Sequence, residues 1–414
     1  MKHSIRIIIG MLLIAIPLCL NAQVKPTRPE EDNKTVSVKP VKADETQEKV
    51  EKAEKEKVEK PKGDIDRMPK ISGFVQGMYQ ANLNGDGELV SNTLRMRRVR
   101  MSIDGTLFKG LTYKIQGDFV RSPMLVDAYL KYKVNDAFAI QFGQFKLPFT
   151  IESLINPVNL EIFDYGESVQ KLAGYSDICG VGALGRDIGI MATGSLIPVE
   201  SNGQRFGLFD YSIGVFNGNG PNVIDNNNHK DIAGRLDIHP WVKALTLSGS
   251  CYFGKYYKDE DYNGIRNRWA AGLQYNDGKL VIRGEYLSGT TGYQGFEGED
   301  APKEFNSMGY YAETGYNFQF GKEGKEQKLM PVLRFEHFEQ QSGVWGIHTA
   351  DHVVYYLPNV SSPTNYYTVG INYWPIKSLN FKLDYSFIDG QKKIDDYYQP
   401  NHSHRIVGIL SYKF

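Results

Sequence analysis

Cysteine, excess charge of either sign and long apolar runs are all scarce in this sequence of 414 residues. There are 3 cysteines, and the 48 basic side chains are matched by 48 acidic ones. Balanced charge gives no basic face, which argues against a protein that binds nucleic acid. A mean hydropathy of -0.40 excludes a bundle of apolar membrane helices.

Aromatic residues are missing from the first 69 positions. All of the 4 Trp, 26 Tyr and 21 Phe lie between Lys70 and Phe414, and only Gly10 and Gly63 among the 42 glycines precede Lys70. A segment without aromatic side chains has little material for a hydrophobic core. We therefore expect a boundary near Lys70, followed by one large domain that covers residues 70–414.

The amino terminus has the parts of a secretory signal. Lys2 and Arg6 precede an apolar run, residues 7–20, which ends shortly before Ala22. The run is shorter than the roughly 20 residues of a spanning helix. The small Ala22 suits a signal-peptide cleavage site. We predict a signal peptide over residues 1–22, cleaved before Gln23, and export from the cytoplasm.

Residues 23–69 have the composition of a solvated spacer. They hold 12 basic and 12 acidic side chains together with five prolines, so they cannot bury a core. The stretch 50–60 alternates Glu and Lys and can form a helix supported by pairs three and four residues apart. A short oligomerising coiled coil is the alternative, but the stretch offers too few apolar heptad positions. We predict a charged periplasmic spacer, mostly disordered or helical.

From Lys70 onward, apolar and polar side chains alternate. In residues 379–387, for example, Leu379, Phe381, Leu383 and Tyr385 alternate with Asn380, Lys382, Asp384 and Ser386. Period-two alternation places one set on each face of a strand. A soluble sandwich would bury the apolar set. The polar set is instead rich in Arg, Lys, Asp and Glu, while the apolar set carries many aromatics near strand ends, as lipid-facing strands around a wet lumen require.

The strand-like segments can be counted. We find about sixteen, near residues 70–80, 93–107, 111–121, 125–134, 138–146, 186–197, 207–216, 230–238, 243–256, 266–276, 279–290, 306–320, 329–340, 364–374, 379–388 and 404–414. Odd-numbered connections, such as 148–185, 217–229 and 389–403, are mostly long, and even-numbered ones are tight. An even count with long loops at one end is typical of bacterial outer-membrane barrels. We predict an all-β, transmembrane antiparallel β-barrel.

The last segment ends on an aromatic residue. Ile406, Gly408, Leu410, Tyr412 and Phe414 share one face of it. A final strand of this kind can pair with the first and leave no unpaired edge in lipid. This supports closure of the barrel.

Several motifs resemble those of the phosphate-selective porin O and P family. They occur in order along the chain as Arg97-Arg98-Val99-Arg100, Gly143-Gln144-Phe145-Lys146-Leu147-Pro148-Phe149 with Glu152, Arg186-Asp187-Ile188-Gly189-Ile190, and Gly214-Val215-Phe216-Asn217-Gly218. The resemblance spans residues 70–414. It implies a sixteen-stranded, trimeric porin in the outer membrane, whose third loop, about residues 148–185, folds into the lumen.

Alternation directs many charged side chains toward that lumen. The predicted pore-lining cations are Arg98, Arg100, Lys114, Lys131, Lys133, Arg235, Arg268, Arg283, Arg334, Lys382 and Arg405. The acidic side chains on the same faces are Asp104, Asp118, Asp127, Asp187, Asp237, Glu285, Glu313, Glu336 and Asp384. One interpretation is that these charges pair across strands in a wet wall. The other is that the arginines form a ladder that replaces the water around an anion.

The third loop itself is acidic. Residues 151–185 contain one cation, Lys171, against Glu152, Glu161, Asp164, Glu167 and Asp177. Lys146 and Arg186 stand at its two ends. With Glu152 and Lys171 they form the predicted constriction region. An excess of carboxylates does not suit an anion-selective constriction, so the residues alone support phosphate selectivity only in part.

We predict passive diffusion of small hydrophilic solutes, including anions such as phosphate, through a homotrimer embedded in outer-membrane lipid. A general porin without anion preference is the alternative, and a structural, adhesive or enzymatic barrel is a further one. No serine, histidine and carboxylate fall into a recognisable catalytic arrangement, so we predict no enzyme. We also predict no cofactor and no metal. The sequence does not decide whether Cys179 and Cys251, which follow the signal peptide, form a disulfide.

Overall fold

The computed structural model describes residues 68–179, 184–259, 262–293, 303–323, 325–342, 360–394 and 397–414. By contacts the chain divides into two units, Met1–Ile65 and Asp66–Phe414. The predicted signal peptide and spacer lie outside the described residues, except for Met68 and Pro69 at the spacer's end, so both remain predictions.

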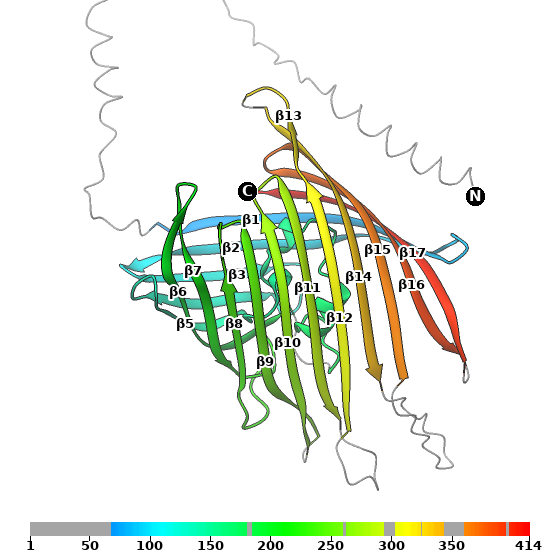
Figure 1. The fold of residues 1–414 in the computed structure, drawn as a ribbon, viewed down its shortest axis with the longest axis horizontal. Coiled ribbons are helices and arrows are strands. Elements are labelled where there is room, and N and C mark those ends of the chain that lie inside the picture. The colour runs from blue at the N-terminus through cyan, green and yellow to red at the C-terminus, as the bar shows by residue number, and fades with distance from the viewer. Residues whose placement is uncertain are drawn as a thin grey trace, which may run out of the picture. The chain divides into compact units, whose positions relative to one another are not determined.

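Strands dominate the described part of the chain (Figure 1). They are β1 (Lys70–Asn84), β2 (Leu89–Phe108), β3 (Leu111–Asp118), β4 (Leu125–Lys133), β5 (Ala139–Lys146), β6 (Arg186–Ser201), β7 (Gln204–Phe216), β8 (Asp231–Ile238), β9 (Leu245–Asp259), β10 (Tyr262–Asn276), β11 (Leu280–Tyr293), β12 (Lys303–Tyr316), β13 (Phe318–Phe320), β14 (Gln327–Ser342), β15 (Val360–Ile376), β16 (Leu379–Ile394) and β17 (Tyr397–Lys413). Three short helices, α3 (Ile151–Leu154), η1 (Pro157–Asn159) and α4 (Glu167–Leu172), lie between β5 and β6.

The strands form one closed antiparallel sheet. Each strand pairs with its neighbours in the chain, and β1 pairs with both β2 and β17. β12 and β13 are one strand interrupted at Asn317, because Gly315 faces Val332 and Phe318 faces Leu329 without a change of register. Among the described residues the barrel therefore has sixteen strands, as predicted.

The carboxyl terminus completes the ring. Phe414 and Gly73 exchange two backbone hydrogen bonds, of 3.0 and 3.1 Å. A side chain at Gly73 would meet the Phe414 ring, so the glycine leaves the space that this aromatic residue fills. Closure removes the unpaired edge that lipid would penalise.

The burial pattern is inverted relative to a soluble protein. Large apolar side chains such as Phe142, Ile213 and Leu333 are more than half exposed, whereas Arg268 and Arg283 are 2% exposed. The alternation of each strand thus sends apolar groups outward and charged groups inward. Within the described ranges, no helix is long and apolar enough to cross a membrane.

One predicted loop is wrong. The connection expected over residues 389–403 is largely a hairpin, in which β16 and β17 continue to pair beyond Asp389 and His402 up to Ile394 and Tyr397. Alternation in the sequence fades beyond Asp389, so the pattern does not predict a strand there. The backbone hydrogen bonds of the sheet continue nevertheless.

Candidate functional site: an inserted loop held by wall arginines

The segment between β5 and β6 turns into the barrel and lies against its inner wall. Lys146 begins this turn, and its ammonium donates to the backbone carbonyls of Ser153 (2.6 Å) and Ile155 (2.8 Å). Further along, Lys382 on β16 donates to the carbonyls of Leu160 (2.5 Å) and Ile162 (2.7 Å). Two lysines, one on β5 and one on β16, therefore hold the loop backbone by hydrogen bonds.

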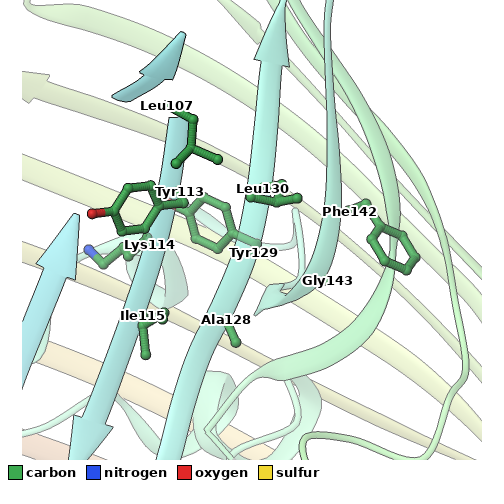
Figure 2. A pocket seen from close by; sticks show the side chains of 9 residues that line it. All are labelled: Leu107, Tyr113, Lys114, Ile115, Ala128, Tyr129, Leu130, Phe142 and Gly143. Carbon is green, nitrogen blue, oxygen red and sulfur yellow. The ribbon is translucent and has the colours of Figure 1, made fainter. Parts of the chain in front are cut away.

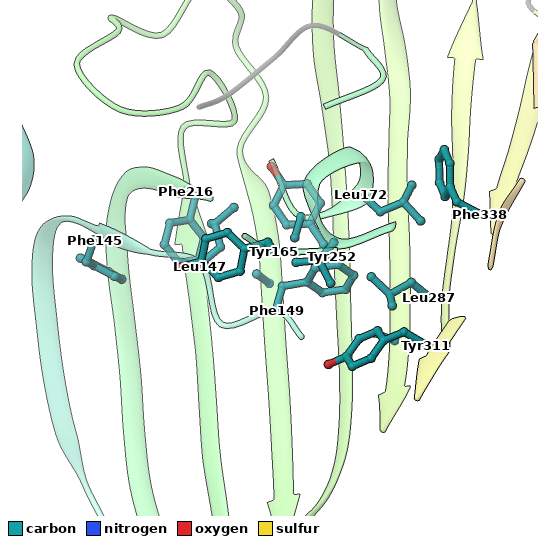
Figure 3. Close-up of a cluster of buried hydrophobic side chains, with 14 of the residues drawn as sticks. Phe145, Leu147, Phe149, Tyr165, Leu172, Phe216, Tyr252, Leu287, Tyr311 and Phe338 are labelled. Carbon is teal, nitrogen blue, oxygen red and sulfur yellow. The ribbon is translucent and has the colours of Figure 1, made fainter. Parts of the chain in front are cut away.

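Apolar side chains fill the space between loop and wall. Phe149, Val169 and Leu172 of the loop join a buried cluster with wall residues that include Phe216 and Tyr311 (Figure 3). The loop is thus packed as a protein core is packed, with side chains from strands on several sides of the barrel. Packing of this kind fixes the position of the segment.

Four acidic residues of the loop pair with wall arginines. Glu152 binds Arg334 on β14 through two contacts of 2.6 and 3.2 Å, and Glu161 binds Arg283 on β11 at 2.9 and 3.2 Å. Asp177 binds Arg266 and Arg268 on β10, at 3.1 and 3.5 Å. Asp164 binds Arg97 and Arg98 on β2, the latter at 3.0 Å. Four of the five carboxylates that made the loop look unsuited to anions are therefore paired with the wall, and the fifth, Glu167, faces Lys171 of the loop itself.

The surroundings of the loop carboxylates shift their pKa values in different directions. Burial alone would raise the pKa of Asp164, but the positive charges of Arg97 and Arg98 outweigh burial and lower it to about 2. Asp177 likewise has a lowered pKa, since Arg266 and Arg268 outweigh its burial. Burial raises the pKa of Glu152 in spite of Arg334. Asp164 and Asp177 are therefore firmly ionised.

The predicted pore-lining cations fall into two groups. Those that are at most 5% exposed are Arg98, Arg100, Arg268, Arg283, Arg334 and Lys382. Those that are half-buried or exposed are Lys114, Lys131, Lys133, Arg235 and Arg405. In the second group, Lys133 pairs with Asp136 at a short turn (2.7 Å) and Arg235 pairs with Asp237 on its own strand (2.9 Å).

The predicted constriction residues lie at different places. Arg186 and Asp127 make a two-contact pair of 2.6 and 3.2 Å at the end of the loop. Lys171 is partly exposed and faces Glu167 one turn away on α4, at 3.7 Å. Lys146 and Glu152 are held by the loop backbone and by Arg334 as described. The structure thus brings Lys146 and Arg186 to the loop base but not Lys171.

Three guanidinium groups gather around Phe163 and Asp164 of the loop. Arg97 and Arg405 lie over the Phe163 ring, with centroid distances of 5.6 and 4.4 Å, and Arg97 shares Asp164 with Arg98. In the described part of the chain Arg405 has no ion pair, and the Nε atoms of all three arginines are buried without a hydrogen-bond partner. Within the described residues, Asp164 is the carboxylate that binds this group directly, while Glu167 and Glu336 act on Arg405 from further away.

Sequence reasoning missed two arginines. Arg97 is absent from the predicted pore-lining cations, but a β-bulge opposite Gln76 and Gly77 lets it share the inner face with Arg98. No signal in the sequence reveals that bulge. Arg266 was overlooked although it is two residues from Arg268, and alternation does place it inward.

The described residues hold no group of three His, Cys, Asp or Glu side chains arranged for a metal ion. Cys179 and Cys251 are separate thiols. The Cys179 thiol donates to Asp177 at 2.8 Å, and burial raises its pKa to about 12. A thiol in that state is a poor nucleophile.

The sequence signature of phosphate-selective porin O and P matches residues 70–414. The chain belongs to this family. The resemblance found in the motifs is thereby confirmed, and the protein is a porin, a passive channel of the outer membrane. No curated protein matches the sequence.

Solved structures show the same fold as this porin at low identity. The anion-selective porin from Comamonas acidovorans is 13% identical with a TM-score of 0.57, covering 84% of this chain and all of its own. The outer membrane channel DcaP of Acinetobacter baumannii is 14% identical with a TM-score of 0.57, covering 84% and 97%. OmpT of Vibrio cholerae, solved in a trimer form, is 11% identical with a TM-score of 0.51, covering 84% and 99%.

Proposed function

We propose that this porin passes small hydrophilic solutes by diffusion and favours anions, phosphate among them. The observation that carries the proposal is the arginine cluster, which we define as Arg97, Arg98 and Arg405 around Asp164. Arg97 and Arg98 both bind Asp164 there, and Arg405 adds a third guanidinium over the neighbouring Phe163 ring. Guanidinium donors match two oxygens of a phosphate at once, which makes arginine suited to this anion.

The acidity of the loop does not oppose this proposal. Glu152, Glu161 and Asp177 are at most 8% exposed, and each lies against an arginine. A carboxylate so paired presents little net charge to a solute in the lumen. Selectivity then depends on the cations left in excess, rather than on the number of acidic residues in the loop.

We assign the buried cations Arg268, Arg283, Arg334 and Lys382 to holding the loop, and the selective role to the arginine cluster together with the half-buried Lys114 and Lys131. A general porin without anion preference remains the competing proposal, since most wall arginines have partners.

Reversal potentials across planar bilayers in a potassium chloride gradient test this assignment. We expect an anion-selective potential in the wild type, a shift toward cations in Arg405→Gln, and no shift in Arg205→Gln, an exposed cation at a short turn. Equal permeability to both ions would establish the general porin instead. Purified protein that gives no ion steps would refute a channel.

We also propose a homotrimer. The barrel wall is formed by short strands at β3, β4 and β5, which have 8, 9 and 8 residues, whereas β14 to β17 have 16 to 17. On this side the exposed Leu107, Ile115, Leu130 and Phe142 border an apolar groove of about 420 Å³ (Figure 2). A second copy of the chain would cover it. A mass of one protomer in native mass spectrometry from mild detergent would refute the trimer.

A further inference from the structure

The helices of the inserted loop take their amino-terminal caps from the barrel wall. The first backbone N–H groups of a helix have no partner within it and need acceptors from elsewhere. At α3, Thr150 accepts from Ser153 N at 3.0 Å. The N–H groups of Ile151 and Glu152 donate instead to the two carboxylate oxygens of Glu285 on β11, at 2.5 and 3.0 Å.

The barrel wall holds the Glu285 carboxylate in position to accept hydrogen bonds from the loop. It is 4% exposed, and the Tyr311 hydroxyl on β12 donates to its Oε2 at 2.7 Å. The carboxylate therefore has two loop donors and one wall donor, and its position is fixed by the wall.

The second helix, α4, shows the same arrangement. Its cap position is Gly166, which has no side chain to contribute. Glu336 on β14 accepts from Ser168 N at 2.9 Å and from Ser168 Oγ at 2.6 Å. A Cβ at Gly166 would lie 2.0 Å from Arg334 Nη2 and 2.5 Å from Glu336 Oε1. The glycine leaves the space that the wall residues occupy.

The two caps belong to one charged network. Arg334 lies between Glu336 (3.5 Å) and Glu152 (2.6 Å), and it also contacts Glu313 on β12 (3.2 Å). Glu152 in turn accepts from Gly166 N at 3.2 Å, which joins the start of α4 to α3. The loop carboxylate Glu152 and the wall carboxylates Glu285 and Glu336 thus fix the relative placement of the two helices.

We propose that Glu285 and Glu336 are positioning residues that set the cross-section of the channel by capping the loop helices from the wall. The inference rests on the proposed channel function. A carboxylate suits the task because both oxygens accept: those of Glu285 from the loop backbone, and those of Glu336 from Ser168 and from Arg334. An amide offers one acceptor and would turn its NH2 group toward a donor. Negative charge at helix amino termini adds to the effect.

Hydrogen–deuterium exchange of the detergent-solubilised full chain tests the caps without recording current. We expect Glu285→Gln to speed exchange in residues 151–154 only, and Glu336→Gln to speed it in residues 167–172 only, by roughly fivefold, as loss of a cap predicts. Gly166→Ala should act as Glu336→Gln does. Glu200→Gln, which removes an exposed carboxylate at the β6–β7 turn, is the matched control.

Bilayer recordings then test the consequence. We expect the open-channel current of the two Gln variants to spread over several levels, with roughly fivefold more time in sublevels than the Glu200→Gln control. Exchange equal to that of the control, or faster exchange spread over the strands, would overturn the proposal. A single current level in both variants would also overturn it. A wild type without ion steps would refute the channel function and leave the exchange result to stand alone.

Discussion

Replacing Asp164 by asparagine should make the porin more anion-selective. The substitution keeps the shape of the side chain and one acceptor oxygen, so Arg98 can still donate to it, but it removes the single carboxylate shared by Arg97 and Arg98. The arginine cluster then has no carboxylate in direct contact. A negative charge that repelled passing anions at this point is gone.

The size of the effect follows from the distance between the charge and the ion path. A unit charge about 6 Å from an ion contributes roughly 0.7 kcal/mol in a water-like dielectric, and more where the lumen is narrow. The ratio of chloride to potassium permeability should therefore rise at least about threefold. The assay is the reversal potential in a potassium chloride gradient across a planar bilayer.

The control is Asp136→Asn, which removes a carboxylate that is 79% exposed at the β4–β5 turn. It should leave the reversal potential unchanged. A shift of Asp164→Asn toward cations, or no shift when single-channel currents are intact, would refute the reasoning. In either case the arginine cluster would not face the ion path.

Two further predictions concern stability. Because the folded pKa of Asp164 is about 2 and the unfolded value 3.8, its ionised form stabilises the barrel by about 2 kcal/mol at higher pH, and this contribution is lost as the pH falls from about 4 to 2. The thermal unfolding temperature should therefore fall more steeply over that pH range in the wild type than in Asp164→Asn. Parallel curves of unfolding temperature against pH would contradict the ion pair. Gly73→Val should lower the yield of folded, heat-modifiable barrel, because its Cβ would lie 2.4 Å from the Phe414 ring and 2.5 Å from the Arg100 carbonyl oxygen. Gly77→Val, whose Cβ meets nothing within 4 Å, should fold normally, and equal yields would mean that the closure does not depend on this contact.

The barrel could be predicted from the sequence because the relevant signal is local. Lys382 and Asp384 face inward and Phe381 and Leu383 outward, as alternation requires of a strand between water and lipid. Each strand carries this pattern by itself, so neither the count nor the order depended on knowing contacts. Beyond Asp389 the alternation fades although β16 and β17 continue to pair, so the sequence does not predict this hairpin.

The loop contacts could not be predicted in the same way. Glu152 and Arg334 are 182 residues apart, and Glu161 and Arg283 are 122 apart, so no spacing relates them. The bulge that turns Arg97 inward depends on pairing with β1 and leaves no mark in its own segment. The sequence indicates the charged residues of the loop and several of the wall arginines, but not which of them pair.

The effect of the loop carboxylates on a passing ion depends on the residues with which they pair. Counted along the chain, five acidic residues against Lys171 suggest a cation-attracting constriction. Counted by contact, Glu152 pairs with Arg334, and Asp177 and Asp164 each bind two arginines, with Arg405 as a further cation beside Asp164. An acidic loop is therefore compatible with an anion channel when its carboxylates hold it to an arginine-rich wall. The same charges that anchor the loop leave a local excess of arginine for the solute to meet.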